Sequence, residues 1–242
     1  MSIALVTGGS RGIGRAICLE LAGAGHHVLV NYRSREEEAK ATLKEVVKAG
    51  GSGELLPFDV GAPLAVKQTL EKWQEENQEK YIDILVNNAG MNRDGLMVFM
   101  SDEDWKDVIA VNQDSFFYVT RQLLQSMLVN KQGRIINVVS LSGQKGLGGQ
   151  VNYSAAKGAV IAATKALAME VAKKKVTVNA VAPGFIRTDM TEGLDEKELS
   201  RLVPLRRFGS PQEVAAVVGF LASDASSYIT GEVISVNGGM YS

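Results

Sequence analysis

The stretch TGGSRGIG, at residues 7–14, follows directly on the apolar run 3–6 and leads into a helical pattern. A short buried strand, a glycine-rich turn and a helix in this order begin a βαβ unit. In open α/β sheets, ligands bind beyond the carboxyl ends of the strands. The stretch therefore predicts both a fold class and the place of a ligand site.

Three glycines of this turn occupy positions where a side chain would interfere. We expect Gly8 to permit a tight turn, Gly12 to let the backbone approach a pyrophosphate, and Gly14 to allow close packing of helix and strand. The helix N-terminus then offers free N–H groups and a positive dipole end to phosphates. The spacing is not G-x-G-x-x-G, because Ile17 takes the third glycine position, and Arg15-Ala16 excludes a P-loop. A tight connection without a ligand is the alternative.

Short apolar runs rich in Val and Ile alternate with longer segments of helical period along the whole chain. The expected strands are 3–6, 28–30, 55–58, 82–86, 135–139, 176–181 and 233–236, and the expected helices include 36–49, 63–80, 102–130 and 152–173. No linker or low-complexity tract interrupts this rhythm. We therefore predict one domain, 1–242, with a doubly wound, parallel seven-stranded α/β sheet of Rossmann type.

Composition excludes several classes of partner and site. The 242 residues carry a net charge of -1, which gives no field for non-specific binding to nucleic acid or to a membrane surface. Cys18 is the only cysteine, so an intramolecular disulfide and a cysteine-based zinc site are excluded. His26 and His27 have no partner ligands, and we expect no metal. No apolar run is long enough for a signal peptide or a membrane span, so we expect a cytoplasmic protein.

The end of the second strand favours one nicotinamide cofactor over the other. An NAD site usually has an Asp or Glu about 20 residues past the glycines to bind the ribose 2′-hydroxyl. Here the strand ends with Arg33 and Arg35 and has no carboxylate before Glu36, while Arg11 lies in the glycine turn itself. Guanidinium groups near the adenine ribose favour a 2′-phosphate, hence NADP. A solvated basic loop is the alternative.

A candidate catalytic group follows the fifth strand. Tyr153 and Lys157 are four residues apart in an expected helix, so their side chains share a face. The neighbouring ammonium is expected to lower the pKa of the phenol from its ordinary value near 10. Ser140, at the strand's end, offers a hydroxyl to the same substrate oxygen. Taken alone, a Tyr-x-x-x-Lys pair is usually just a helix surface.

Together these residues resemble the short-chain dehydrogenase/reductase family over essentially the whole chain. The marks are TGGSRGIG, Asp59-Val60, NNAG at 87–90, Asn112, Ser140 with YSAAK at 153–157, and PGFIRTD at 183–189. Within the family the chain looks like the 3-oxoacyl-[acyl-carrier-protein] reductases, through NRDGL at 92–96, Trp105, TDMT at 188–191 and the ending VNGGMY at 236–241. These last marks are shared with reductases of acetoacetyl-CoA, quinones and other carbonyls.

The resemblance implies roles for matching positions. Tyr153 would protonate a ketone oxygen as hydride arrives from NADPH, and Lys157 would lower the Tyr153 pKa and bind the nicotinamide ribose. Ser140 would orient the carbonyl, and Asn112 would hold a water that links Lys157 to solvent. The residues expected to bind the cofactor are Gly8, Ser10, Arg11, Gly12, Ile13, Gly14, Arg33, Asp59, Val60, Asn87, Ala89, Gly90, Tyr153, Lys157, Pro183, Gly184, Ile186 and Thr188.

The substrate and partners are less closely defined by the sequence. The segment 191–203 is expected to form a small helical lid, with Leu194, Leu199 and Leu202 at helical spacing. An acidic acyl-carrier protein would dock on a basic patch formed by Lys131, Arg134 and residues 173–175, although a charged helix end explains those residues equally well. Family members are usually homotetramers. The alternatives to an acyl-carrier substrate are another carbonyl, such as acetoacetyl-CoA, a quinone or a polyketide intermediate, or a non-catalytic dinucleotide-binding subunit.

Overall fold

Each strand of the sheet runs parallel to its neighbours, as the unalternating apolar runs predicted. The computed structural model describes residues 2–241 and has one seven-stranded sheet with the order β3-β2-β1-β4-β5-β6-β7. Its strands are β1 (Ile3–Val6), β2 (His27–Tyr32), β3 (Ser52–Pro57), β4 (Ile84–Asn87), β5 (Gly133–Val138), β6 (Val176–Pro183) and β7 (Val233–Val236). The predicted fold class is thereby confirmed.

The strand order changes direction between β1 and β4. The chain first builds outward from β1 to β2 and β3, and then returns to pair β4 with the free side of β1. Connections leaving β1 and β4 therefore diverge above the carboxyl ends of these strands. That divergence opens the crevice in which ligands of open α/β sheets bind.

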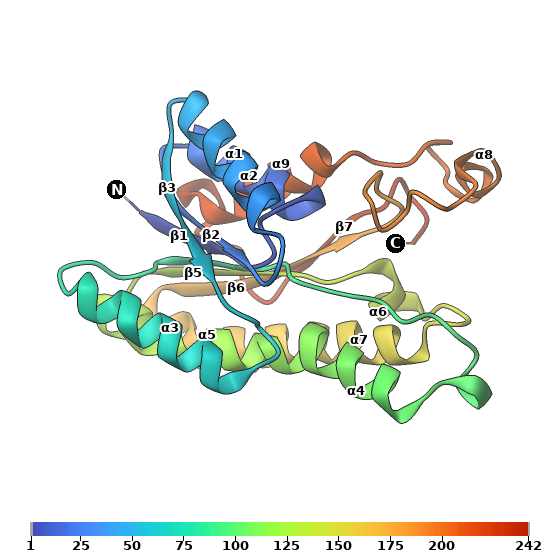
Figure 1. Cartoon of the computed structure of the whole chain (residues 1–242), viewed down its shortest axis with the longest axis horizontal. Coiled ribbons are helices and arrows are strands. Elements are labelled where there is room, and N and C mark those ends of the chain that lie inside the picture. Colours follow the sequence, from blue (N-terminus) through green and yellow to red (C-terminus); the bar gives the residue numbers. More distant parts are fainter. Residues whose placement is uncertain (1, 242) are drawn as a thin grey trace.

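Helices cover both faces of the sheet (Figure 1). On one face lie α1 (Gly12–Gly23), α2 (Glu36–Lys48) and α9 (Pro211–Ala222), and on the other lie α3 (Pro63–Glu76), α4 (Asp102–Ile109), α5 (Ser115–Asn130) and α7 (Val151–Val171). Each layer encloses an apolar core, since strand residues of opposite parity face opposite ways: Ala4 and Val6 belong to one core, and Ile3 and Leu5 to the other.

The expected helix 102–130 is interrupted in the structure. Between α4 and α5 the backbone makes a turn of π-helix over Ala110–Asp114. Asn112, in this turn, donates from Nδ2 to the carbonyl of Val108 at 2.9 Å and to the carbonyl of Met91 at 2.7 Å. The π-turn thus changes the direction of the Asn112 side chain within an otherwise amphipathic helix. Hydrophobic periodicity could not predict this change.

The segment 191–203 projects beyond the carboxyl edge of the sheet and holds only short helices, α8 (Glu196–Leu199) and a 3-10 turn (Ser200–Leu202) (Figure 1). Leu194 and Leu202 are exposed. Its role as a substrate lid remains a prediction. Within residues 2–241, the helices are all too short or too polar to cross a bilayer.

Candidate active site

A cavity of about 340 Å³ opens at the carboxyl edge of the sheet, above the crevice between β1 and β4. The structure brings to its wall nearly all the residues expected at a cofactor or catalytic site. These are Gly8, Ser10, Arg11, Gly12, Ile13, Gly14, Arg33, Asp59, Val60, Ala89, Gly90, Ser140, Tyr153, Lys157, Pro183, Gly184, Ile186 and Thr188. Asn87 and Asn112 are the expected site residues that do not line it.

The glycine turn has a backbone that leaves little room for side chains at Gly8 and Gly14. Gly8 and Gly12 have positive φ values of 64° and 54°, a conformation that disfavours side chains. A Cβ on Gly14 would stand 2.1 Å from the carbonyl oxygen of Gly8, so the first turn of α1 packs directly on the loop that precedes it. The backbone itself therefore forms this wall of the cavity.

Two asparagines hold the turn in place: Asn88, which belongs to the NNAG motif but was given no role of its own, and Asn31, which was not among the predicted site residues. Asn88 Nδ2 donates to the carbonyls of Thr7 at 2.9 Å and of Gly8 at 3.3 Å, and the backbone N–H of Gly8 donates to Asn31 Oδ1 at 3.1 Å. Thr7 Oγ1 in turn accepts from the backbone N–H of Asn88 at 2.9 Å. Their placement at the ends of β2 and β4 was the available signal.

Asn87 faces away from the cavity. Its Nδ2 donates to Asn137 Oδ1 at 2.9 Å and to Thr120 Oγ1 at 3.2 Å, between β5 and α5. Neighbouring residues of a strand point to opposite faces, so Asn88 faces the glycine turn. The expectation that Asn87 lies along the cofactor therefore transfers, for its side chain, to Asn88.

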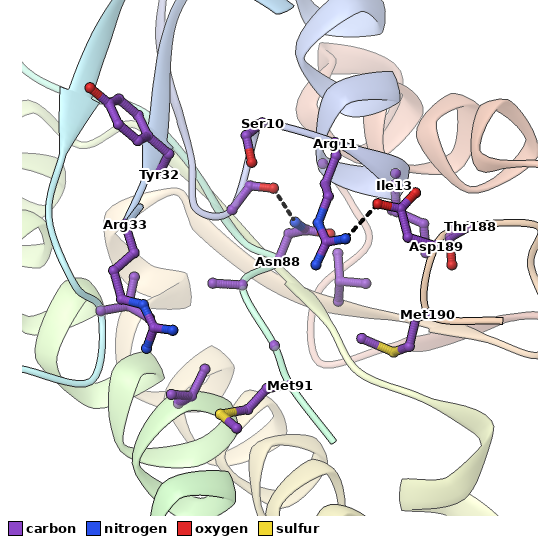
Figure 2. A pocket seen from close by; sticks show the side chains of 18 of the residues that line it. Ser10, Arg11, Ile13, Tyr32, Arg33, Asn88, Met91, Thr188, Asp189 and Met190 are labelled. Carbon is purple, nitrogen blue, oxygen red and sulfur yellow. Dashed lines mark hydrogen bonds and ion pairs between the residues drawn. The ribbon is translucent and has the colours of Figure 1, made fainter. Parts of the chain in front are cut away.

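Arg11 bridges the cavity in this structure. Its guanidinium contacts Asp189 Oδ2 at 2.5 Å, joining the glycine turn to the loop after β6 (Figure 2). The hydrogen bond from Arg11 holds the pKa of Asp189 below its ordinary value. Both side chains remain about half exposed, at 44% and 52%. Asp189 was not expected at the site, because its partner lies far away in the sequence.

Arg33 stands at the opposite end of the cavity from Asp189, beside Tyr32 (Figure 2). Its guanidinium lies 3.6 Å from Asp59 Oδ2 and is 63% exposed, so it remains available to a ligand. Asp59 is fixed by the backbone N–H of Gly61, which donates to its Oδ1 at 2.9 Å. The two predicted arginines thus line the cavity at different places, one beside β2 and one in the glycine turn.

The candidate catalytic residues meet where β5 ends against α7. Ser140 caps the short helix α6 (Leu141–Lys145) and accepts from the backbone N–H of Ser142 at 3.1 Å. Lys157 is buried and donates from Nζ to the carbonyl of Val138 at 2.9 Å, 5.7 Å from the centre of the Tyr153 ring. A strand end and one helix face therefore present all three groups to the cavity.

Burial changes the proton affinities of this group, and in one case against expectation. Loss of solvent around the phenol raises the pKa of Tyr153 to about 12, and the contact with the Ser140 hydroxyl opposes this only in part. Burial likewise lowers the pKa of Lys157 to about 8. The expected lowering of the Tyr153 pKa is thus wrong: desolvation raises it, and the effect that opposes desolvation comes from Ser140 and not from Lys157. At neutral pH Tyr153 therefore carries the proton that a general acid must donate.

Asn112 lies behind this group and has one unused acceptor. Its Oδ1 is buried and accepts no hydrogen bond among the described residues. A Cβ on Gly90 would lie 2.8 Å from that oxygen and 3.6 Å from Lys157 Nζ. Gly90 therefore leaves space between Asn112 Oδ1 and Lys157 Nζ. A buried acceptor without a hydrogen-bond partner is costly in free energy.

Comparison with known proteins assigns this arrangement to a family. A family model described as enoyl-(acyl carrier protein) reductase matches residues 8–241. The chain belongs to the short-chain dehydrogenase/reductase family. The 3-oxoacyl-[acyl-carrier-protein] reductase of Synechocystis sp. is 46% identical over 98% of this chain and 96% of its own length. The reductases named FabG of Escherichia coli and Aquifex aeolicus are 46% and 48% identical, each over 99% of this chain and 97% of their own length.

The architecture of this short-chain dehydrogenase/reductase also matches a solved structure. The crystal structure of a suggested gluconate dehydrogenase from Agrobacterium tumefaciens superposes with a TM-score of 0.94, at 33% identity, over 99% of this chain and 95% of that one. The family predicted from the sequence is confirmed, and with it the class of oxidoreductase.

Other residues singled out in the sequence lie outside the reductase site. Cys18 is fully buried in the first core, where desolvation raises the pKa of its thiol, so it is unreactive. Among residues 2–241 no cluster of three His, Cys, Asp or Glu side chains could hold a metal ion.

The expected basic patch is only partly present. Arg134 is buried, its guanidinium 3.1 Å from Asp224, and so does not join Lys131 on the surface. The exposed lysines 131 and 173–175 precede β5 and β6, at the amino edge of the sheet. The cavity lies at the other edge, roughly 20 Å away along β5 at about 3.3 Å per residue.

Proposed function

We propose that the protein catalyses the NADPH-dependent reduction of a 3-oxoacyl thioester, carried by an acyl-carrier protein, to the 3-hydroxyacyl thioester. One observation carries the proposal: Ser140, Tyr153 and Lys157 meet at the cavity that the glycine turn also lines. The names of relatives at 46–48% identity give the substrate class. The pathway supported in this way is fatty-acid synthesis or a related form of acyl-chain synthesis.

The cavity wall fits a dinucleotide. Gly8 and Gly12 leave the backbone without side chains at the N-terminus of α1, where free N–H groups favour a pyrophosphate. Arg33 and Arg11 favour an adenosine that carries a 2′-phosphate, because no carboxylate stands at the end of β2. When bound, NADPH supplies a hydride for the ketone carbon. Ile186 and Thr188, after β6, lie where the nicotinamide end would be held.

The side chains of this chain manage one proton. The Ser140 hydroxyl donates to the ketone oxygen and orients it toward the phenol. Tyr153 transfers its proton to that oxygen as the carbonyl becomes an alkoxide, so that the product leaves as an alcohol. The Lys157 ammonium then stabilises the phenolate, and the open Oδ1 of Asn112 holds a water through which the proton is replaced.

Carrier docking and assembly are further parts of the proposal. Lys131 and Lys174 are exposed and basic, as an acidic carrier requires, but lie across the sheet from the cavity of their own chain. Reversal of both charges is expected to weaken turnover of carrier-bound substrate and to spare a small thioester. Equal losses on both substrates would exclude docking there.

We also propose a homotetramer, supported by exposed Trp105, Phe117 and Phe220 on α4, α5 and α9, to be checked by light scattering.

The deciding experiment compares kcat/KM for one acyl group in several forms. Carrier-bound, CoA-bound and free 3-oxo substrates are supplied with NADPH or NADH, together with a 2-enoyl thioester. The proposal expects the carrier-bound ketone with NADPH to be the best pair. A better CoA or free ketone would indicate another carbonyl substrate, comparable use of NADH would contradict the role of Arg33 and Arg11, and preference for the enoyl thioester would exclude ketone reduction.

A further inference from the structure

A buried chain of polar side chains joins β4, β5 and α7 beside the catalytic group. Asn87 Nδ2 donates to Asn137 Oδ1 at 2.9 Å, and Asn137 Nδ2 donates to Thr164 Oγ1 at 2.8 Å. The Thr164 hydroxyl then donates to the carbonyl of Val160 at 2.7 Å. Asn137 and Thr164 are both fully buried. Nothing in the proposed reaction uses either side chain.

The bond between Asn137 and Thr164 is a directional contact in a largely apolar interface. The neighbouring contacts of α7 with the sheet come from Ala156, Val160 and Ala168, which are buried. Apolar packing of such small groups has no directional preference and resists sliding along the helix axis only weakly. A hydrogen bond out of reach of water, by contrast, fixes its two partners within a few tenths of an ångström.

The position of α7 matters for the proposed reaction because this helix carries Tyr153 and Lys157. Thr164 lies on the same face of α7 as Lys157, two turns further on and roughly 10 Å along the axis. Asn137 immediately precedes Val138, whose carbonyl accepts from Lys157 Nζ. Two polar contacts, one catalytic and one not, therefore join α7 to adjacent residues of β5.

We propose that Asn137 and Thr164 are positioning residues that set the axial position of α7 and hold Tyr153 and Lys157 opposite Ser140. The inference rests on the proposed function, because it assigns these side chains to the geometry of that proton transfer. A displacement of about 1 Å is enough to cost a proton donor much of its rate, since the donor must reach its acceptor within about 3 Å.

The test compares three threonine variants. Thr164→Val keeps the shape and removes the hydroxyl, and is expected to lower kcat about tenfold while leaving KM for the ketone nearly unchanged. Thr164→Ser keeps the hydroxyl and should restore kcat. Thr120→Val is the matched control, because Thr120 accepts from the same Asn87 but sits on α5, which carries none of Ser140, Tyr153 and Lys157. The proposal expects Thr120→Val to keep the wild-type kcat.

A second variant breaks the bridge from the strand. Asn137→Leu is close to Asn in shape, and it leaves Thr164 bonded to Val160 and Asn87 bonded to Thr120. The same loss of kcat is expected, also if Thr164→Val does not fold. Wild-type kcat in Asn137→Leu, or equal losses in Thr164→Val and Thr120→Val, would overturn the inference.

Hydrogen–deuterium exchange of residues 151–158 separates this inference from the proposed function. If the wild-type protein reduces no carbonyl, the proposed function fails, but exchange still reports how firmly the first turns of α7 are held against the sheet. Faster exchange there in Thr164→Val than in Thr120→Val supports the inference. Equal exchange in the two variants overturns it.

Discussion

The two halves of the cavity differ in composition: one is formed by backbone and the other by functional side chains. On the side of β1 and α1, the wall is backbone: Gly8, Gly12 and Gly14 contribute no side chains, and Asn88 donates to the carbonyls of Thr7 and Gly8. On the side of β5 and α7, the wall consists of the functional groups of Ser140, Tyr153 and Lys157, and burial shifts the pKa of the last two. The first half requires that side chains be absent, whereas the second requires three particular side chains.

The two halves are therefore expected to lose their function through different kinds of substitution. A phosphate site formed by backbone groups does not titrate near neutral pH. Its geometry is disturbed when a side chain is added. A group of buried acids and bases tolerates changes of volume around it better than changes of charge or position.

Tyr153→Phe removes the proton donor and leaves the rest of the cavity intact. We expect kcat to fall by about 10³-fold, within the range for loss of a general acid, and NADPH to bind with nearly unchanged affinity. Steady-state kinetics and fluorescence titration of the cofactor measure the two quantities. Undiminished activity would restore the possibility of a non-catalytic dinucleotide-binding subunit.

Gly14→Ala tests the backbone half. The added Cβ would lie 2.1 Å from the Gly8 carbonyl oxygen, so the turn must move. We expect NADPH affinity to drop on the order of 100-fold, together with a lower melting temperature, because the turn itself forms the phosphate site. Gly23→Ala is the control, since a Cβ at Gly23, at the end of α1, meets nothing within 4 Å. Equal NADPH affinity in the two variants would contradict the assignment.

The pH dependence of the side-chain half follows from Lys157. Burial lowers the pKa of Lys157 to about 8, so its ammonium is present below that pH and is lost above it. We expect kcat/KM for reduction to be flat near pH 7 and to fall about tenfold per pH unit well above 8. Tyr153, with a pKa of about 12, keeps its proton throughout this range. If instead the rate begins to fall only near pH 10, burial does not control this site.

Asp189→Asn is expected to have the smallest effect. The carboxylate of Asp189 holds the Arg11 guanidinium, and its removal frees Arg11 for a phosphate. NADPH should bind about two- to fivefold tighter at low salt, because the pair is exposed, and the gain should shrink as salt is added. Weaker binding in this variant would mean that the ion pair closes over the cofactor and does not compete with it.

The comparison also separates what could be predicted from what could not. The glycine turn and the Tyr153–Lys157 pair were found in the sequence because each is a local pattern: a turn between strand and helix, and two residues one helical turn apart. Asn87 and Asn88 are adjacent and identical in chemistry, and only the pleat of β4 decides which of them faces the cavity. Arg134 looked like a surface charge until Asp224, distant in the sequence, was found beside it.

The alternation of strands and helices, the family and the chemistry of the residues at the strand ends follow from the order of residues, because they depend on periodicity and on neighbours along the chain. The π-turn at Asn112, the Arg11–Asp189 bridge and the direction in which the Tyr153 pKa moves arise only in the folded chain. The reason is physical: solvent exclusion and contacts between distant segments are properties of the packed chain. The lysine four residues after Tyr153 could be read from the sequence, whereas the loss of water around the phenol could not.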